Sequence, residues 1–233
     1  NPNLEIGEVY VGIAGHHIKS LQTRGDIVRH HTEEEITQRE IDQLIADQYK
    51  TYIPAGDQII DVIPQEFAVD NFQNIPNPIG YGGVKVGANF HIITGDRNAI
   101  RNINRSVEKA GLHSKDLVLQ PLASSAAVMG QEDLEAGVAI VDIGGGSTEI
   151  IKGDRNRFID YVSLPVGSVK LTEMFIKSNP PEEYELKALN AFLKDCIKTP
   201  FDGQGCAFIG TGGTITTLAS LCLGLEKYDK NMI

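Results

Sequence analysis

The 233-residue chain is short of cysteine and of basic residues, and each shortage excludes a class of protein. Its three cysteines, at 196, 206 and 222, form no Cys-x-x-Cys pair, which excludes a thiolate zinc site and suits a reducing compartment. We interpret them as small buried hydrophobic residues. With 21 Lys and Arg against 31 Asp and Glu, the chain lacks the clustered positive charge that a phosphate backbone demands. Nucleic acid is therefore not an expected partner.

Long apolar runs are also missing. No run approaches the roughly 20 residues that span a bilayer, so no transmembrane segment is expected. The first residues, Asn-Pro-Asn-Leu-Glu, do not have the charged-then-apolar pattern of a signal peptide, and we expect a cytoplasmic protein. What remains is an ordinary globular composition, 41% hydrophobic, which suffices for one large domain or two small ones.

The stretch from 138 to 149 carries the clearest chemistry. An apolar run at 138–141 predicts a buried strand, and it leads through Asp142 into three consecutive glycines and two hydroxyl residues. Glycines let a backbone close on a ligand, and turned N–H groups then form an anion cradle beside which Asp142 can hold a Mg²⁺-bound water. A plain glycine hairpin is the alternative. The candidate phosphate-binding residues are Gly144, Gly145, Gly146, Ser147 and Thr148.

A second glycine segment follows near the end of the chain. Residues 206–209 predict a strand that runs into glycines, and a helical pattern comes directly after them. A helix N-terminus favours negative charge, so this segment suits the sugar and base of a nucleotide, or a polyphosphate. The candidate residues are Gly210, Thr211, Gly212 and Gly213.

Residues 20–90 predict a smaller α+β unit. Thr32 and Glu35 form a capping box, so we expect a helix to begin there and to end before Pro54. Two β-rich runs, 58–70 and 83–95, flank a turn-rich segment. Pro64 makes the first run an edge or bulged strand, whose open backbone groups could serve self-association.

Further along, the pattern predicts a hairpin turning at Gly153, a helix from Ser168, and another helix after Pro180 whose apolar stripe we interpret as core. Two histidine pairs, at 16–17 and 30–31, could suggest metal. Adjacent residues of an extended chain point to opposite sides, so we favour polar strand ends instead.

The glycine stretch resembles the second phosphate loop of the actin-like ATPases. The front of the chain is similar to one family of that superfamily, the bacterial cell-division actin FtsA. The resemblance implies that residues 20–90 are the inserted subdomain that serves self-polymerisation and contacts with division proteins. It also makes Gln120 a candidate for positioning the attacking water, although a Gln that caps a turn before Pro121 is an equal alternative. The motifs lie at 9–22, 63–67, 77–80, 89–95 and 119–128.

From about residue 138 the chain instead resembles the exopolyphosphatase and guanosine-pentaphosphate phosphohydrolase family, on the motifs at 142–149, 163–173 and 209–218. Asp142 and Glu149 match that family's loop acids, which implies a Mg²⁺ site and a catalytic role for Glu149. Serines at 124 and 125 stand near the place of the family's catalytic Glu, and the opening phosphate hairpin is not found, so we expect slow turnover.

Together these patterns predict an α/β fold: an incomplete actin-like (ribonuclease H-like) ATPase core with an inserted small α+β subdomain. We expect one core lobe at 1–19 and 91–133, the insert at 20–90, and a second lobe at 134–233. The expected function is ATP–Mg²⁺ binding in an FtsA-like protein, peripheral to the membrane in that family. A phosphoanhydride hydrolase acting on polyphosphate and an inactive scaffold are the alternatives, and the two resemblances suggest a fusion.

Overall fold

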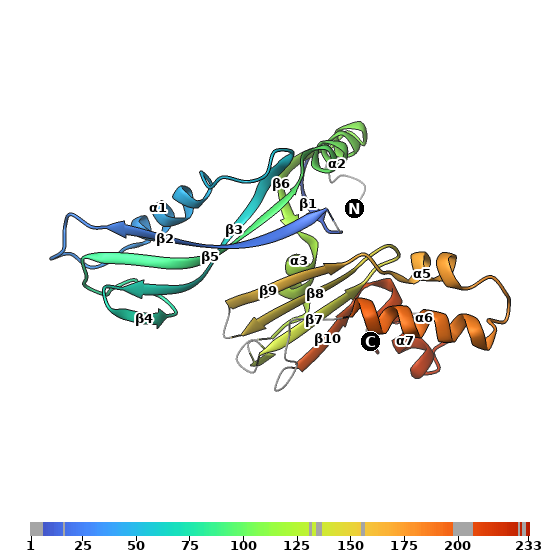
Figure 1. Ribbon diagram of the computed structural model, residues 1–233. Coiled ribbons are helices and arrows are strands. Elements are labelled where there is room, and N and C mark those ends of the chain that lie inside the picture. Colours follow the sequence, from blue (N-terminus) through green and yellow to red (C-terminus); the bar gives the residue numbers. More distant parts are fainter. Residues whose placement is uncertain are drawn as a thin grey trace. The chain divides into compact units, whose positions relative to one another are not determined.

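The structure is a computed structural model, shown in Figure 1, which describes residues 7–15, 17–130, 132–133, 137–154, 157–197, 207–227, 229 and 232–233. The side chains of 154 and 157–159 are outside this description. The chain divides into two compact units, here called the front unit (1–11 and 17–118) and the rear unit (12–16 and 119–233).

The front unit is built on a four-stranded antiparallel sheet with the strand order β2-β5-β3-β4. The two long runs predicted from the sequence form β3 (Asp57–Val69) and β5 (Lys85–Asp96). Two strands were not predicted, β2 (Ile18–Val28) and the short β4 (Phe72–Ile75). A separate two-stranded sheet pairs β1 (Glu8–Ile13) with β6 (His113–Leu119).

Helix α1 (Gln38–Gln48) covers one face of the front sheet (Figure 1). Ile41 and Leu44 are buried there with Phe67, Phe90 and other sheet residues in one apolar core. The predicted start of this helix was wrong: its capping box is formed by Thr37 and Glu40, five residues later than expected.

Pro64 lies at a bulge, as predicted. The register between β3 and β5 shifts between Pro64 and Phe67, because proline cannot donate to the ladder. On the other side of β3, β4 pairs only with Phe67 and Val69. In the described part of the front unit, the stretch 57–66 therefore has no strand partner on that side.

Helix α2 (Arg97–Lys109) begins directly after β5. The Asp96 carboxylate caps it by accepting the amides of Asn98 and Ala99 at 2.9 Å. Ile100 is its buried residue, and Gly111, with a φ of 79°, follows the last turn in the left-handed conformation that glycine favours.

The rear unit contains a second four-stranded sheet in the order β10-β7-β8-β9. The strands β7 (Val138–Ile143), β8 (Thr148–Asp154) and β9 (Arg157–Leu164) form an antiparallel meander. β10 (Ala207–Thr211) joins β7 in parallel. The predicted hairpin is confirmed, but β8 continues through Gly153, and the turn falls outside the described residues.

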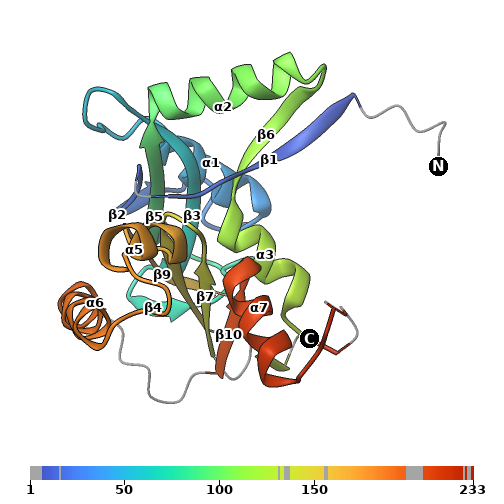
Figure 2. The same cartoon turned by 90° about the vertical axis from the view of Figure 1, so that its right-hand side faces the viewer.

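Helices α3 (Gln120–Val128), α5 (Ser168–Phe175) and α7 (Gly212–Cys222) of the rear unit contribute to the site. Helix α6 (Glu183–Cys196) follows α5 in the chain. Figure 2 shows α7 leaving the end of β10 without an intervening loop. Among the described residues, no helix is long and apolar enough to cross a membrane.

Two interpretations of buried residues were wrong. The apolar stripe of α6 is not fully buried: Leu189, Phe192, Leu193 and Cys196 are half-buried, and Leu186 and Ile197 are 43% and 52% exposed. The buried residue of that helix is Glu185. Its carboxylate accepts hydrogen bonds from the Lys177 and Glu182 amides and from the Ser178 hydroxyl. These bonds explain why a charged residue faces inward there. Cys222 is exposed and Cys196 half-buried, and Cys206 lies outside the described residues.

His30 and His31 follow the end of β2 and are both exposed. His16 lies outside the described residues. In the described part of the chain, no three His, Cys, Asp or Glu residues gather as metal ligands.

Candidate functional site

The glycine turn between β7 and β8 is closed on itself and held by α5. The Gly144 amide donates to the Ser147 carbonyl at 3.0 Å. The Gly144 and Gly145 carbonyls accept the amides of Ser168 and Lys170, both at 3.0 Å, at the start of α5. The two carbonyls of the turn are thus directed at one helix terminus.

This arrangement decides where the amides point. In a planar trans peptide the N–H is directed opposite to the preceding C=O, so the amides of Gly145 and Gly146 point away from α5. Neither donates to a backbone acceptor in the described part of the chain. A Cβ at Gly146 would meet nothing within 4 Å, so the space beside the turn is open. Two neighbouring amides that are not used by the backbone can hold an anion.

Close packing against α5 explains a further glycine. A Cβ on Gly167 would lie 2.5 Å from the backbone of Gly145 and 2.6 Å from the Gly144 carbonyl. These are backbone atoms, which cannot swing aside. Gly167 therefore lets the helix approach the turn and fixes its position.

Four polar residues form one row across the rear sheet. Thr211 on β10 is opposite Asp142 on β7, Asp142 is opposite Glu149 on β8, and Glu149 is opposite Ser163 on β9. Residues directly opposite in a sheet project from the same face. Asp142 and Glu149 are only 5% and 3% exposed. Two carboxylates thus share one buried face of the sheet.

Burial raises the pKa of Asp142, because desolvation disfavours the charged form. The side chains of Gln120 and Thr211 lie beside this carboxyl and lower its pKa, but by less. Gln120 is the exposed first residue of α3. The Thr211 hydroxyl is buried, and among the described residues it has no hydrogen-bond partner at normal distance. The predicted water-positioning residue and the predicted metal residue are therefore neighbours.

Glu149 is held from the side of β9. Its Oε1 accepts the Ser163 hydroxyl at 3.0 Å. The Tyr161 hydroxyl is buried and has no hydrogen-bond partner in the part of the chain that the structure describes. Burial raises the pKa of Tyr161, and the negative charge of Glu149 raises it further, so this hydroxyl stays protonated.

The second glycine segment approaches the same carboxylate. Gly212 has a φ of 86°, and a Cβ there would lie 2.3 Å from Asp142 Oδ1. At Gly213 a Cβ would meet nothing within 4 Å. The Thr214 hydroxyl donates to the Ser168 hydroxyl at 3.2 Å, which links the first turns of α7 and α5. Asp142 therefore lies next to the N-terminus of α7.

The residues present fit a hard divalent cation. Mg²⁺ prefers carboxylate oxygens and retains waters, and Asp142 and Glu149 supply two carboxylates on one face. Neither forms an ion pair with a Lys or Arg in the described residues, so a cation there would meet no competing positive side chain. The unpaired Thr211 hydroxyl could bind a metal-bound water.

The structure brings together most of the residues singled out from the sequence, with differences in detail. The Thr148 hydroxyl already donates to the Val166 carbonyl at 2.7 Å, so it supports the turn. Gly210 admits Ile215, whose Cγ2 would lie 2.6 Å from a Cβ there. No hydrogen bond of the Ser147 hydroxyl occurs among the described residues. Sequence reasoning did not find Ser163, Tyr161 or Gly167; only the period-two alternation in β9 signalled the first two.

Known protein families match two different segments of the chain. Residues 15–94 match the family model of the SHS2 domain inserted in FtsA, and residues 122–231 match that of the Ppx/GppA phosphatase family. The cell division protein FtsA of Neisseria meningitidis is 36% identical over 174 residues, which are 75% of this chain and 42% of that protein. FtsA of Pseudomonas aeruginosa is 34% identical over 180 residues, 77% of this chain and 43% of that protein.

The chain thus spans less than half the length of these curated relatives. Among solved structures, the PilM–PilN type IV pilus biogenesis complex superposes with a TM-score of 0.60 over 94% of this chain and 68% of that one, at 14% identity. That likeness concerns the fold. The chain has an actin-like fold in which an FtsA-type SHS2 segment precedes a Ppx/GppA-like segment.

Proposed function

We propose that the rear unit binds the phosphates of ATP together with Mg²⁺. The observation that carries this proposal is the pair of amides at Gly145 and Gly146, which donate to no backbone acceptor among the described residues and follow the buried Asp142 along the chain. Amides hold phosphate oxygens, and the N-terminus of α7 adds a partial positive charge.

In this proposal Asp142 and Glu149 hold the metal through carboxylate oxygens or metal-bound waters. A bound Mg²⁺ would neutralise phosphate charge. Ser163 orients Glu149 by its hydrogen bond of 3.0 Å. Gln120, whose side chain lies beside Asp142, would orient a water near the phosphates.

Titration calorimetry with ATP, in the presence and absence of Mg²⁺, tests the proposal. Asp142→Asn should weaken binding of Mg-ATP more than binding of metal-free ATP, because a neutral amide holds a hydrated cation less well. Glu173→Gln, which removes an exposed acid of α5, is the matched control and should change neither affinity. Equal losses in both titrations would mean that Asp142 has only a structural role.

A second candidate is phosphoanhydride hydrolysis on polyphosphate, favoured by the match of residues 122–231 to the Ppx/GppA family and by the buried Glu149. Phosphate release from long-chain polyphosphate measures it. If Glu149→Gln abolishes a release that the parent shows, hydrolysis is supported. If the parent releases none while it binds Mg-ATP, the first function stands alone.

The front unit suggests the cellular setting. By its likeness to FtsA, we propose that the chain acts with bacterial division proteins at the cytoplasmic side of the membrane and self-associates. The unpaired side of β3 over 57–66 offers backbone groups for such contacts. Sedimentation velocity with and without Mg-ATP measures assembly; a single monomeric species at all concentrations would contradict it.

A further inference from the structure

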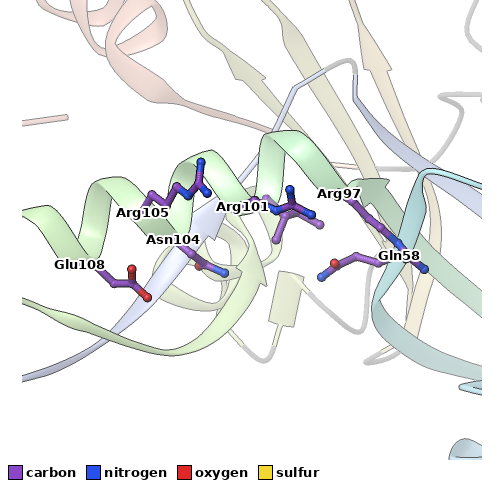
Figure 3. Close-up of a pocket in the computed structure, with 7 residues that line it drawn as sticks. Gln58, Arg97, Arg101, Asn104, Arg105 and Glu108 are labelled. Carbon is purple, nitrogen blue, oxygen red and sulfur yellow. The ribbon is translucent and has the colours of Figure 1, made fainter.

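The front unit has a basic groove that the rear-unit site does not use. This groove, about 550 Å³ in volume, is lined by one face of α2 and by Gln58 of β3 (Figure 3). Its lining residues are Gln58, Arg97, Ile100, Arg101, Asn104, Arg105 and Glu108.

Three arginines, Arg97, Arg101 and Arg105, define the groove. They recur every four residues, so they lie along one side of α2 about 6 Å apart in rise. All three are exposed, and none forms an ion pair within the described residues. The Arg97 Nε donates to the Asp57 carbonyl at 2.9 Å, which fixes the first guanidinium at the end of the groove near β3.

This concentration of positive charge is unusual for the protein. The formal net charge of the chain is -10, whereas α2 carries three arginines and Lys109 against one acid, Glu108. Unpaired guanidinium groups in a row are suited to carboxylate or phosphate groups, which they can bind in a bidentate manner. The groove therefore fits an anionic ligand.

We propose that this groove binds an acidic peptide segment in an extended conformation, with Asp or Glu at alternate positions. In an extended chain, alternate side chains project to one side about 6.6 Å apart, close to the spacing of the arginines. The Gln58 amide, which lines the same groove, can bond to peptide backbone groups. A peptide backbone can hydrogen-bond to this amide through both its N–H and C=O groups, whereas a bare polyanion has no N–H groups to donate.

One feature disfavours a uniformly charged polyanion. Glu108 closes one end of the lined face and would repel a phosphate there, whereas a peptide can place a neutral or basic residue against it. An acidic peptide satisfies the arginines without placing charge along the whole groove.

Fluorescence anisotropy on the full chain tests the proposal, with a fluorescein-labelled peptide of alternating Ser and Glu as the probe. We expect binding that weakens as salt rises, because exposed ion pairs are screened. The double variant Arg101→Gln with Arg105→Gln should weaken it about tenfold or more. Arg39→Gln, an exposed arginine of α1, is the control and should leave binding unchanged.

The peptide itself provides a second measurement that does not depend on folding of a variant. A peptide of alternating Ser and Gln should not bind. The proposal is overturned if neither peptide binds, if both bind alike, or if the arginine variants bind as the parent does. It is also overturned if polyphosphate or single-stranded DNA of equal charge binds more tightly at the same ionic strength.

Discussion

Gly212 and Gly213 are adjacent, yet alanine should have opposite effects on stability at the two positions. Gly212 has a φ of 86°, where an L-residue costs roughly 1–2 kcal/mol. Its added Cβ would lie 2.3 Å from Asp142 Oδ1, so the buried carboxylate must also move out of its row. We expect Gly212→Ala to lower the free energy of unfolding of the rear unit by roughly 2–4 kcal/mol.

Gly213 differs in both respects. Its φ is not positive, so an L-residue fits the backbone, and an added Cβ would meet nothing within 4 Å. Alanine reduces the entropy of the unfolded chain, so Gly213→Ala should raise the free energy of unfolding by about 0.4–1 kcal/mol. Urea denaturation followed by far-ultraviolet circular dichroism measures both variants.

Binding provides the second readout of the same pair. Because Gly212→Ala displaces Asp142, it should also remove the Mg²⁺ dependence of ATP binding. If Gly212→Ala unfolds at the same urea concentration as the parent, the close approach of α7 to Asp142 does not exist in solution. If Gly213→Ala is as damaging as Gly212→Ala, conformation and contact are not what distinguishes the two positions.

Three further predictions concern buried acids. Folding raises the pKa of Asp142, so the folded state holds the proton of this carboxyl more tightly than the unfolded state does. The free energy of unfolding should therefore fall as the pH rises above about 4. In the absence of metal, Asp142→Asn should reduce this pH dependence in urea denaturation. Hydrogen bonds from Ser178, then from the Glu182 and Lys177 amides, lower the pKa of Glu185 to about 2. Its stabilisation should therefore be lost as pH falls from about 4.5 towards 2, and Glu185→Gln should remove this loss in acid denaturation monitored by circular dichroism. Ser163→Ala should raise the Mg²⁺ concentration needed for ATP binding, while Ser163→Thr, which keeps the hydroxyl, should restore it in calorimetry.

The sequence predicted strands well where one or both faces are apolar, and failed where tertiary contacts decide. β3 and β5 were found from their apolar content, whereas β2 alternates between half-buried and exposed residues and has little hydrophobic signal. β4 was hidden in a segment rich in turn residues, because four residues are too few for a periodicity.

The start of α1 illustrates the same limit at a single position. The chain offers two capping boxes of identical pattern, at Thr32 and at Thr37, and local propensity cannot separate them. The buried Arg29 guanidinium donates to the Glu34 and Glu35 carbonyls at 2.8 and 2.9 Å. A helix that began at Thr32 would need these carbonyls as acceptors for its own backbone hydrogen bonds. The second box therefore forms the cap.

The sequence predicted the two glycine segments of the candidate site but not that they lie together. Both glycine segments were visible because glycine and hydroxyl residues follow apolar runs. Their convergence depends on β10 joining β7 in parallel with Thr211 opposite Asp142, and such pairing between distant strands has no local signal. The roles of Ser163 and Tyr161 depend on the same register, since β9 places them beside Glu149 only through its pairing with β8.

The register therefore specifies the site more than either glycine segment does. Side chains alternate between faces along a strand, so a shift of β10 by one residue would move Thr211 out of the row and bring Gly210 opposite Asp142. The helix that begins at Gly212 would shift with it, and its N-terminus would no longer meet the carboxylate. Ile140 of β7 pairs with the half-buried Ile209 of β10, and such a shift would break this apolar pair. The apolar interior of the rear sheet thereby fixes the geometry of a polar site at its end.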